Sequence, residues 1–532
     1  MKINNPYSQN RYTFKERMER KFTELVIPLI RYIPMSDKIH FDSKPKYIPG
    51  SIFRIRRHMK YRENHKIWDN SKPSYMDIDL LSVYVSEYIP IENIDNLEKG
   101  LLKIFKEHKP VSYAYNDPSQ IKTFCNEVRQ SIYGGRWSTF GHIAIDKDSE
   151  LYNYVKHIEI HATQISSSSI ILGFNISPSE PYLNIYKSEM RRNIEEETTL
   201  HPSVKKFFTF WGSRTIPGDA AKEKKIEDLL LELKWRTLKE MGKYLEMYFI
   251  SNKIIFPSIE VYKIQQDFSE IKLKKNESQF LSSIGLRESY YHDKSKDGYW
   301  DIYGGDTTDK IDSSVKITCN SHLPGEPYYS THDFQIEDSV REFADNLLPI
   351  LVMRNYTMNL SENIAIQQKE IFSSIKKSKP NYKKLINIRY DLETNLQLLK
   401  RFKSEISDDV YKQFKYIIKN SIGEFEPVNR NSKDKVWSEI IVENTKFMIE
   451  KTFTHSQNLS KIIDDTVKLL EIKTNNSLRK KTFSLTIFTV ILSLIATAFA
   501  GLSLYYSLDK EEQNKVVGVL DYLKTAWTYF FS

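Results

Sequence analysis

The feature that most constrains this chain is an uncharged run near its end. Residues 482–508 contain no Asp, Glu, Lys or Arg and are rich in Ile, Leu and Phe. Roughly 20 apolar residues of helix cross a bilayer core, because each residue of an α-helix rises about 1.5 Å. The run is long enough to span, so we predict a transmembrane helix at 482–508.

The rest of the chain is polar. Its 532 residues have a mean hydropathy of -0.50, which excludes a transporter with many spans. The amino terminus lacks the apolar core of a secretory signal, and basic residues 479–481 precede the uncharged run, whereas acidic residues follow it. The positive-inside rule therefore predicts residues 1–481 in the cytoplasm and the carboxy-terminal tail outside.

The compartment is indicated by two further features. Cys125 and Cys319 are the only cysteines, too few for a disulfide framework, which favours a reducing compartment. The abundance of Lys, Ile and Asn is typical of a bacterial sequence. We therefore expect the inner (cell) membrane of a bacterium.

Periodicity predicts the fold. Apolar and polar residues alternate in short runs between about residues 120 and 190, which indicates a mixed sheet, and an amphipathic helix is expected at 220–249. After about residue 334 only helical periodicity remains, with Ser361 as the expected N-cap of one helix. We predict an α+β cytoplasmic region, an all-α helical stalk and one C-terminal transmembrane helix.

The predicted domain ranges follow this order. They are a cytoplasmic α/β sensor region at 1–333 with a candidate division near 215–220, a helical domain at 334–433, a long stalk helix at 434–481, the transmembrane helix at 482–508 and an amphipathic tail at 509–532.

Residues in the stalk recur at intervals of seven, and such a seam implies a partner helix. The seam consists of Ile441, Met448, His455, Ile462, Leu469 and Asn476. The positions four residues further on are mainly polar, so a dry two-stranded zipper is not expected. Two arrangements fit: packing on the preceding helices of the same chain, or a ring of identical stalks around a polar axis.

Hydroxyl groups follow one face of the uncharged helix. Thr486, Thr489, Ser493 and Thr497 share that face by their helical spacing. Such residues permit close helix packing and also suit a pore wall, so we predict them as pore-lining in a homo-oligomer. A plain anchor remains the alternative, because Ser and Thr can bond back to their own helix.

The tail has two interpretations. Apolar residues of 516–532 fit an amphipathic helix at the outer interface, with its aromatics at headgroup level. The segment is also at the lower length limit for a second span.

A basic cluster near the amino terminus is the candidate ligand site. It contains Arg54, Arg56, Arg57 and Arg62. A solvated face is the simple interpretation, and binding of phosphate groups is the functional one. The formal net charge of +9 permits an anionic ligand without indicating nucleic acid.

Motifs for catalysis are absent. We find no phosphate-binding glycine loop, dinucleotide fingerprint, nucleophile elbow or zincin pair. His157, Glu159 and His161 alternate along one predicted strand, with His142 on a neighbour. That pattern suits a divalent metal, but it is also the polar side of a half-buried strand. We predict no catalytic residues, no metal and no cofactor, and a protein that is not an enzyme.

The layout of residues 360–532 resembles the CorA-type divalent cation channels, in which such stalks form a funnel. The family's Gly-Met-Asn signature is absent, and "AGLSLYYSLDKEE" stands after the span. The layout looks more like the CorA-like membrane effectors of bacterial anti-phage systems, including the Hailong effector subunit and CRISPR-associated CorA-like proteins. That resemblance implies a cytoplasmic sensor that controls a pore through a nucleotide or oligonucleotide signal.

The leading hypothesis is an oligomeric, ligand-gated membrane ion channel or membrane-disrupting effector. Its expected partners are membrane lipid, further copies of itself in a tetramer or pentamer, and a nucleotide or oligonucleotide signal made by a nucleotidyltransferase. The alternative is a membrane-anchored cytoplasmic enzyme or scaffold, and a divalent cation transporter is the third hypothesis.

Overall fold

The computed structural model divides the chain into two units. Unit 1 comprises Met1–Ala365 and Thr394–His455, and unit 2 comprises Ile366–Glu393 and Ser456–Ser532. The described residues are 18, 21, 24–26, 28–29, 56, 69–111, 117–130, 136–166, 168–195, 197–202, 211–264, 275–286, 292–295, 298–304, 314–320, 332–375, 382–405, 422, 424–427, 436–507 and 510–531. The predicted ranges 334–433 and 434–481 each contribute to both units.

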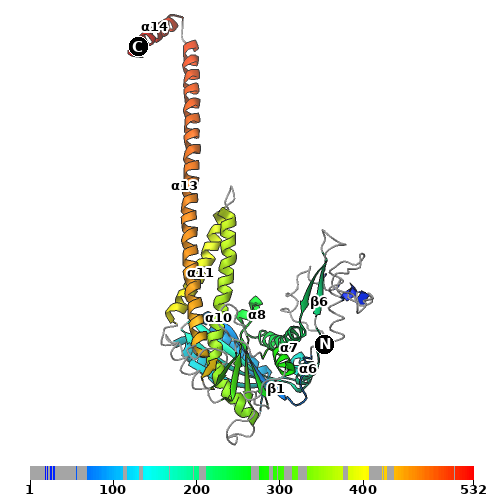
Figure 1. Ribbon diagram of the computed structural model, residues 1–532. Coiled ribbons are helices and arrows are strands. Elements are labelled where there is room, and N and C mark those ends of the chain that lie inside the picture. The colour runs from blue at the N-terminus through cyan, green and yellow to red at the C-terminus, as the bar shows by residue number, and fades with distance from the viewer. Residues whose placement is uncertain are drawn as a thin grey trace, which may run out of the picture. The chain divides into compact units, whose positions relative to one another are not determined.

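Unit 1 is built on a ten-stranded sheet (Figure 1). The spatial order is β12-β9-β10-β11-β8-β1-β5-β4-β3-β2. The strands are β1 (Ile78–Pro90), β2 (Lys109–Pro110), β3 (Arg136–Ala144), β4 (Val155–Ser166), β5 (Ser169–Pro178), β8 (Ser258–Ile264), β9 (His292–Ser295), β10 (Trp300–Tyr303), β11 (Ser314–Asn320) and β12 (Phe425–Pro427). Among the described strands β8 and β11 alone pair in parallel, so the sheet is mixed, as predicted. A separate hairpin pairs β6 (Glu197–Pro202) with β7 (Trp211–Ile216).

One face of the sheet is apolar and is covered by several helices. Val83, Ile143, Ile158 and Ile176 lie in one row across β1, β3, β4 and β5, and all four are fully buried. Burial of such a row removes apolar area from water at about 25 cal/mol per Å². The covering helices are α4 (Ile94–Glu107), α5 (Ser119–Gln130), α6 (Glu180–Arg191), α7 (Gly218–Met241) and α9 (Lys275–Ser283).

Helix α7 carries a buried charge onto this face. Lys234 Nζ donates to Ser258 Oγ at 2.7 Å and forms an ion pair with the buried Glu260. The predicted helix at 220–249 ends earlier, at Met241, and a turn follows its C-cap residue Gly242. The short helix α8 (Tyr248–Asn252) then begins.

The second face of the sheet lies beneath helix α10 (His332–Ile375) (Figure 1). The Tyr84 hydroxyl of β1 donates to the Glu337 carbonyl of α10 at 3.1 Å. The predicted N-cap at Ser361 is wrong, since α10 continues through that residue. Leu360 and Ile364 are buried there, and this tertiary packing overrides the local preference of Ser for a helix start.

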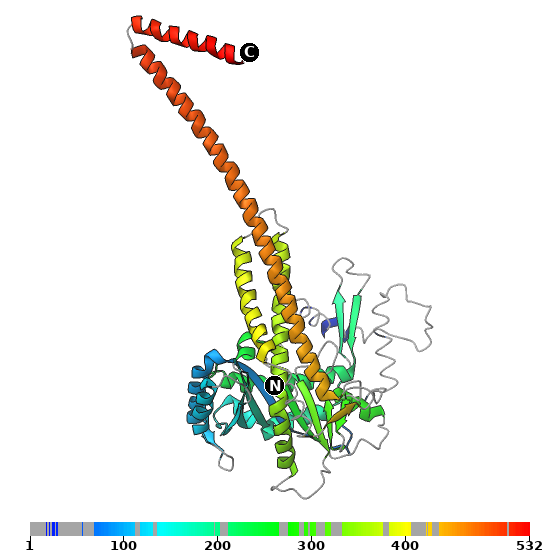
Figure 2. The same cartoon turned by 90° about the vertical axis from the view of Figure 1, so that its left-hand side faces the viewer.

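Unit 2 consists of helical segments. They belong to α10, to α11 (Tyr382–Glu405) and to α13 (Trp437–Ser507), and α14 (Lys510–Phe531) completes the unit. Lys384 pairs with Glu370 at 3.1 Å and Arg389 pairs with Asp464 at 2.7 Å, so the three segments lie side by side (Figure 2). Residues buried in this bundle are Ile371, Leu385, Leu392, Leu459 and Ile463.

Gly100 tests the packing of unit 1. A methyl group at this position of α4 would overlap the backbone carbonyl of Tyr244. We expect Gly100→Ala to lower the free energy of unfolding by about 2 kcal/mol, because backbone atoms cannot yield as a side-chain end can. Urea titration of the detergent-solubilised chain, followed by tryptophan fluorescence, measures this.

The matched control is Gly518→Ala in α14, where no heavy atom lies within 4 Å of the added methyl group. It should leave stability unchanged or slightly raised. Equal effects of the two substitutions would contradict the packing of α4.

Candidate functional site

A row of polar side chains crosses the sheet face beneath α10. The register pairs His142 of β3 with Glu159 of β4, Glu159 with Asn175 of β5, and Asn175 with Tyr84 of β1. Opposed residues of antiparallel strands share a face, so these four side chains form one row. His157 and His161 stand two residues from Glu159 and therefore lie on the same face, as their alternation predicts.

His142 reaches this face because of a β-bulge. The pairing of β3 with β4 shifts between Thr139 and Gly141, so Phe140 is an extra residue in β3. Gly141 has a φ of 129°, a conformation that other residues rarely adopt. Without the bulge, Thr139 and His142 would point to opposite faces, and the imidazole would meet the apolar core.

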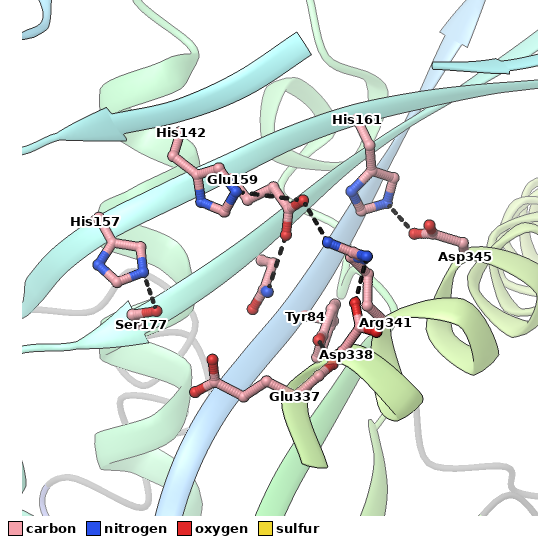
Figure 3. Close-up of polar contacts among 11 residues, drawn as sticks. Tyr84, His142, His157, Glu159, His161, Ser177, Glu337, Asp338, Arg341 and Asp345 are labelled. Atoms are coloured by element: carbon pink, nitrogen blue, oxygen red, sulfur yellow. Dashed lines mark hydrogen bonds and ion pairs between the residues drawn. The ribbon is translucent and has the colours of Figure 1, made fainter. Parts of the chain in front are cut away.

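Glu159 is the centre of the polar row (Figure 3). Its side chain is 3% exposed. Asn175 Nδ2 donates to Glu159 Oε2 at 3.2 Å, and Oε1 lies 3.5 Å from both His142 Nε2 and Arg341 Nη1. A buried carboxylate is stable only when other groups replace its water, so the partners from β3, β5 and α10 keep it in place.

A second ion pair joins β4 to α10. His161 Nε2 lies 3.0 Å from Asp345 Oδ1, and burial raises the pKa of Asp345. Arg341 and Asp345 are one helical turn apart, just as Glu159 and His161 are two residues apart on the strand. On the helix, Arg341 thus faces the carboxylate of Glu159, and Asp345 faces the imidazole of His161. These two contacts together fix the register of the helix on the sheet.

The remaining histidines are held as neutral groups. Burial lowers the pKa of His142, and burial, with smaller contributions from the neighbouring His142 and Lys156, lowers that of His157 from its ordinary 6.5 to about 4. His157 Nε2 lies 2.7 Å from the hydroxyl of Ser177, which is 8% exposed. A hydroxyl so buried is unsuited to attack an external substrate, and the pair is a structural hydrogen bond.

No group of three metal-binding side chains is arranged to hold an ion within the part of the chain that the structure describes. The His and Glu residues of the alternating pattern are engaged separately, with Ser177, Arg341 and Asp345.

The predicted ligand site is not brought together in the described residues. Arg54, Arg57 and Arg62 lie outside them. Arg56 is described, is helical and is half-buried. The phosphate-binding role of this cluster stays a prediction.

The apolar helix near the C-terminus is the second candidate site. Residues Asn475–Ser507 of α13 form a helix that is long and apolar enough to cross a membrane, and its most apolar stretch is not buried in the chain. The chain thus carries a helix compatible with membrane anchoring. Among the predicted pore-lining residues, Thr486, Thr489 and Thr497 donate their hydroxyls to the carbonyl four residues earlier, at 2.8, 2.9 and 2.8 Å. Ser493 lies on the same face.

Those hydrogen bonds limit what the hydroxyl stripe can do. A hydroxyl has one donor and two acceptor lone pairs, so each Thr has used its donor and still accepts. The stripe can therefore receive hydrogen bonds from water or contact a cation. It does not require a partner helix to satisfy its donors.

The stalk seam departs gradually from the buried side of α13. Ile441 is fully buried, Met448 and His455 are half-buried, and Ile462, Leu469 and Asn476 are exposed. A row of buried residues along the helix consists instead of Ile441, Thr445, Ile449, Thr452, Ser456, Leu459 and Ile463. Their spacing is close to 3.6, the period of a straight helix, so an exact seven-residue repeat drifts around it.

No protein-family model matches the chain, and no curated protein matches it in sequence. The structure itself defines the class: an amino-terminal mixed sheet region, followed by a mostly helical part that ends in one apolar candidate transmembrane helix.

Gly173 tests how His161 is held. A methyl group at 173 would overlap the His161 imidazole. We expect Gly173→Ala to lower the free energy of unfolding by about 2 kcal/mol, since the ring must leave Asp345. In the double variant Gly173→Ala/His161→Ala the clash is gone, so urea titration should show a loss at least about 1 kcal/mol smaller than the sum of the single losses. If the losses of the two single variants simply added in the double variant, the packing of the His161 ring against Gly173 would be contradicted.

His157 should make unit 1 sensitive to acid. Its folded pKa lies below the unfolded value, so the unfolded chain binds more protons between pH 6.5 and 4, and stability falls as pH drops through that window. We expect a loss of about 2 kcal/mol, after allowing for partial exposure, and a flatter profile in His157→Gln. Urea titrations at several pH values measure this. An acid sensitivity that is unchanged in His157→Gln would contradict this assignment.

Proposed function

We propose that the chain is an oligomeric, ligand-gated membrane ion channel or membrane-disrupting effector, acting in bacterial anti-phage defence. The observation that supports this most is the apolar helix Asn475–Ser507, none of which is buried in the chain. An apolar surface of that size in water is strongly unfavourable, and a bilayer or other copies of the helix would remove it.

The hydroxyl stripe supports the pore. An anchor surrounded by lipid gains nothing from Thr486, Thr489, Ser493 and Thr497 on one face, whereas several copies facing one axis would line it with oxygen acceptors. Basic residues 479–481 before the uncharged run 482–508 and acidic ones after it favour a cytoplasmic unit 1 and an outer tail, in the bacterial cell membrane.

The signal in this proposal is an anionic nucleotide or oligonucleotide, bound by the basic cluster at Arg54, Arg56, Arg57 and Arg62 and made by a partner nucleotidyltransferase. The polar row beneath α10 is unsuited to that role, because the acids of α10 around it, together with Glu159, outnumber the Lys and Arg side chains at that contact. A ligand that binds one state more tightly by about 3 kcal/mol would raise an open population from 1% to one half.

A second function is favoured by one observation. The Thr hydroxyls are bonded to their own helix, which is also what a simple anchor in lipid requires. The chain would then be a membrane-anchored cytoplasmic enzyme or scaffold, with the span serving only to localise it.

Ion leak distinguishes the two functions. The full chain is reconstituted in liposomes, and potassium efflux is measured with and without a mixture of nucleoside triphosphates and short oligoadenylates. We expect Thr489→Leu/Ser493→Leu to reduce the efflux about tenfold or more, because leucine removes the oxygen acceptors and narrows the axis.

Ser484→Leu is the matched control. Ser484 precedes Thr486 by two residues, about 200° around the helix, so it lies on the opposite face. Its efflux should equal that of the wild type. A particle that is monomeric in detergent, together with cell toxicity that survives replacement of 482–508 by an unrelated anchor, would overturn the channel and support the anchored enzyme or scaffold.

A further inference from the structure

Carboxyl groups predominate where the sheet meets α10. Glu159 faces the interface from β4, and the first turns of α10 carry further acids. The charged groups at or near this contact are Lys156, Glu159, Lys263, Asp333, Glu337, Asp338, Arg341, Glu342 and Asp345, with His142, His157 and His161 on the strands. Lys263 is already paired with Asp333, and Arg341 is shared between Glu159 and Asp338. Positive charge is therefore scarce at this contact.

The side chains at this contact fit together in one arrangement, but some of its buried polar atoms lack hydrogen bonds. Gly173 leaves the space that the His161 ring occupies, and the ring pairs with Asp345. Asn175 Oδ1 and His161 Nδ1 are buried and lack a hydrogen-bond partner among the described residues. A polar network with such gaps holds less firmly than an apolar contact of the same area, so a small change in charge can shift it.

Glu337 is the group whose charge changes near neutral pH. Burial, together with the charges of Asp333 and Glu159, raises its pKa from the ordinary 4.5 to about 7. Its backbone carbonyl accepts the Tyr84 hydroxyl, so the residue sits at the docking contact. Above pH 7 the interface gains a negative charge that repels Glu159, and the lowered pKa values of His142 and His157 keep those two imidazoles neutral, so neither offsets it.

We propose that the contact between β4 and the first part of α10 is a proton-responsive latch, which holds the helix on the sheet when Glu337 is protonated and loosens as that carboxyl ionises. The sign follows from linkage: the docked state keeps the proton to a higher pH than the free helix, so docking is strongest below about pH 4.5, weakens as pH rises, and has lost this contribution once pH has passed through 7. The latch belongs to unit 1 alone. Its use in gating rests on the proposed function, whereas its existence does not.

Hydrogen exchange of the full chain in detergent tests the latch. Exchange of the amides at 334–346 is followed by mass spectrometry at pH 6 and pH 8.5, with times corrected for the intrinsic pH dependence. We expect opening of this segment to increase about tenfold from the lower to the higher pH. Glu337→Gln should remove the increase, because the amide stays neutral at both values.

Glu342→Gln is the matched control. It removes the same charge from an exposed position on the same helix, and the increase should persist. The amides of α8 provide an internal reference, because Glu87, whose pKa burial raises to about 8, accepts hydrogen bonds from Phe249 and Ile250. Their response should be the same in Glu337→Gln as in the wild type, which also shows that the variant is folded.

Two results would overturn the latch: exchange in α10 that does not change with pH in the wild type, or an increase that survives in Glu337→Gln. Neither result bears on ion leak from liposomes, so failure of the latch leaves the proposed channel intact. Conversely, liposomes that do not leak, with an α10 whose exchange still depends on pH, would overturn the proposed channel and leave the latch intact.

Discussion

Burial of Glu159 is the constraint on which the arrangement of unit 1 depends. A carboxylate that is 3% exposed needs polar or positively charged groups around it, and here Asn175 of β5 donates a hydrogen bond while His142 of β3 and Arg341 of α10 lie 3.5 Å away. The same strand places Ile158 and Ile160 on the opposite face, fully buried in the apolar core. One face of β4 is therefore held by the burial of apolar surface, and the other is held by specific polar and charged partners. The second is selective, because a helix without Arg341 and Asp345 in the right turn would leave charges unpaired.

Helix α10 links this polar face to the rest of the chain. Its first part is docked by ion pairs, and further along Leu360 and Ile364 pack as ordinary core residues. A helix held by titratable groups at one end and by apolar groups further on is well suited to change its docking locally while remaining folded. In the proposed effector such a helix would be a route by which an event in unit 1 is felt elsewhere. The anchored enzyme or scaffold would need no such route.

The C-terminal helix shows how one motif supports two functions. Hydroxyls that bond to their own backbone are compatible with lipid, and their remaining acceptors are compatible with water. Local geometry cannot separate an anchor from a pore wall, because both satisfy the same backbone. The difference lies in how many copies meet, which is a property of the assembly and not of one helix.

Local sequence determined the elements that depend on neighbouring residues along the chain. The uncharged run at 482–508, the alternation of His157, Glu159 and His161, and the mixed sheet before a helical region could all be recognised without coordinates, because helix and strand impose periods that a sequence must match. Tertiary structure alone decided which faces meet. The bulge at Thr139–Gly141 brings His142 opposite Glu159, and α10 covers a polar face that the alternation alone leaves open to solvent. The seam from Ile441 to Asn476 leaves the buried side of α13, and α10 runs through Ser361. These outcomes depend on contacts between residues far apart in the chain, for which periodicity carries no information.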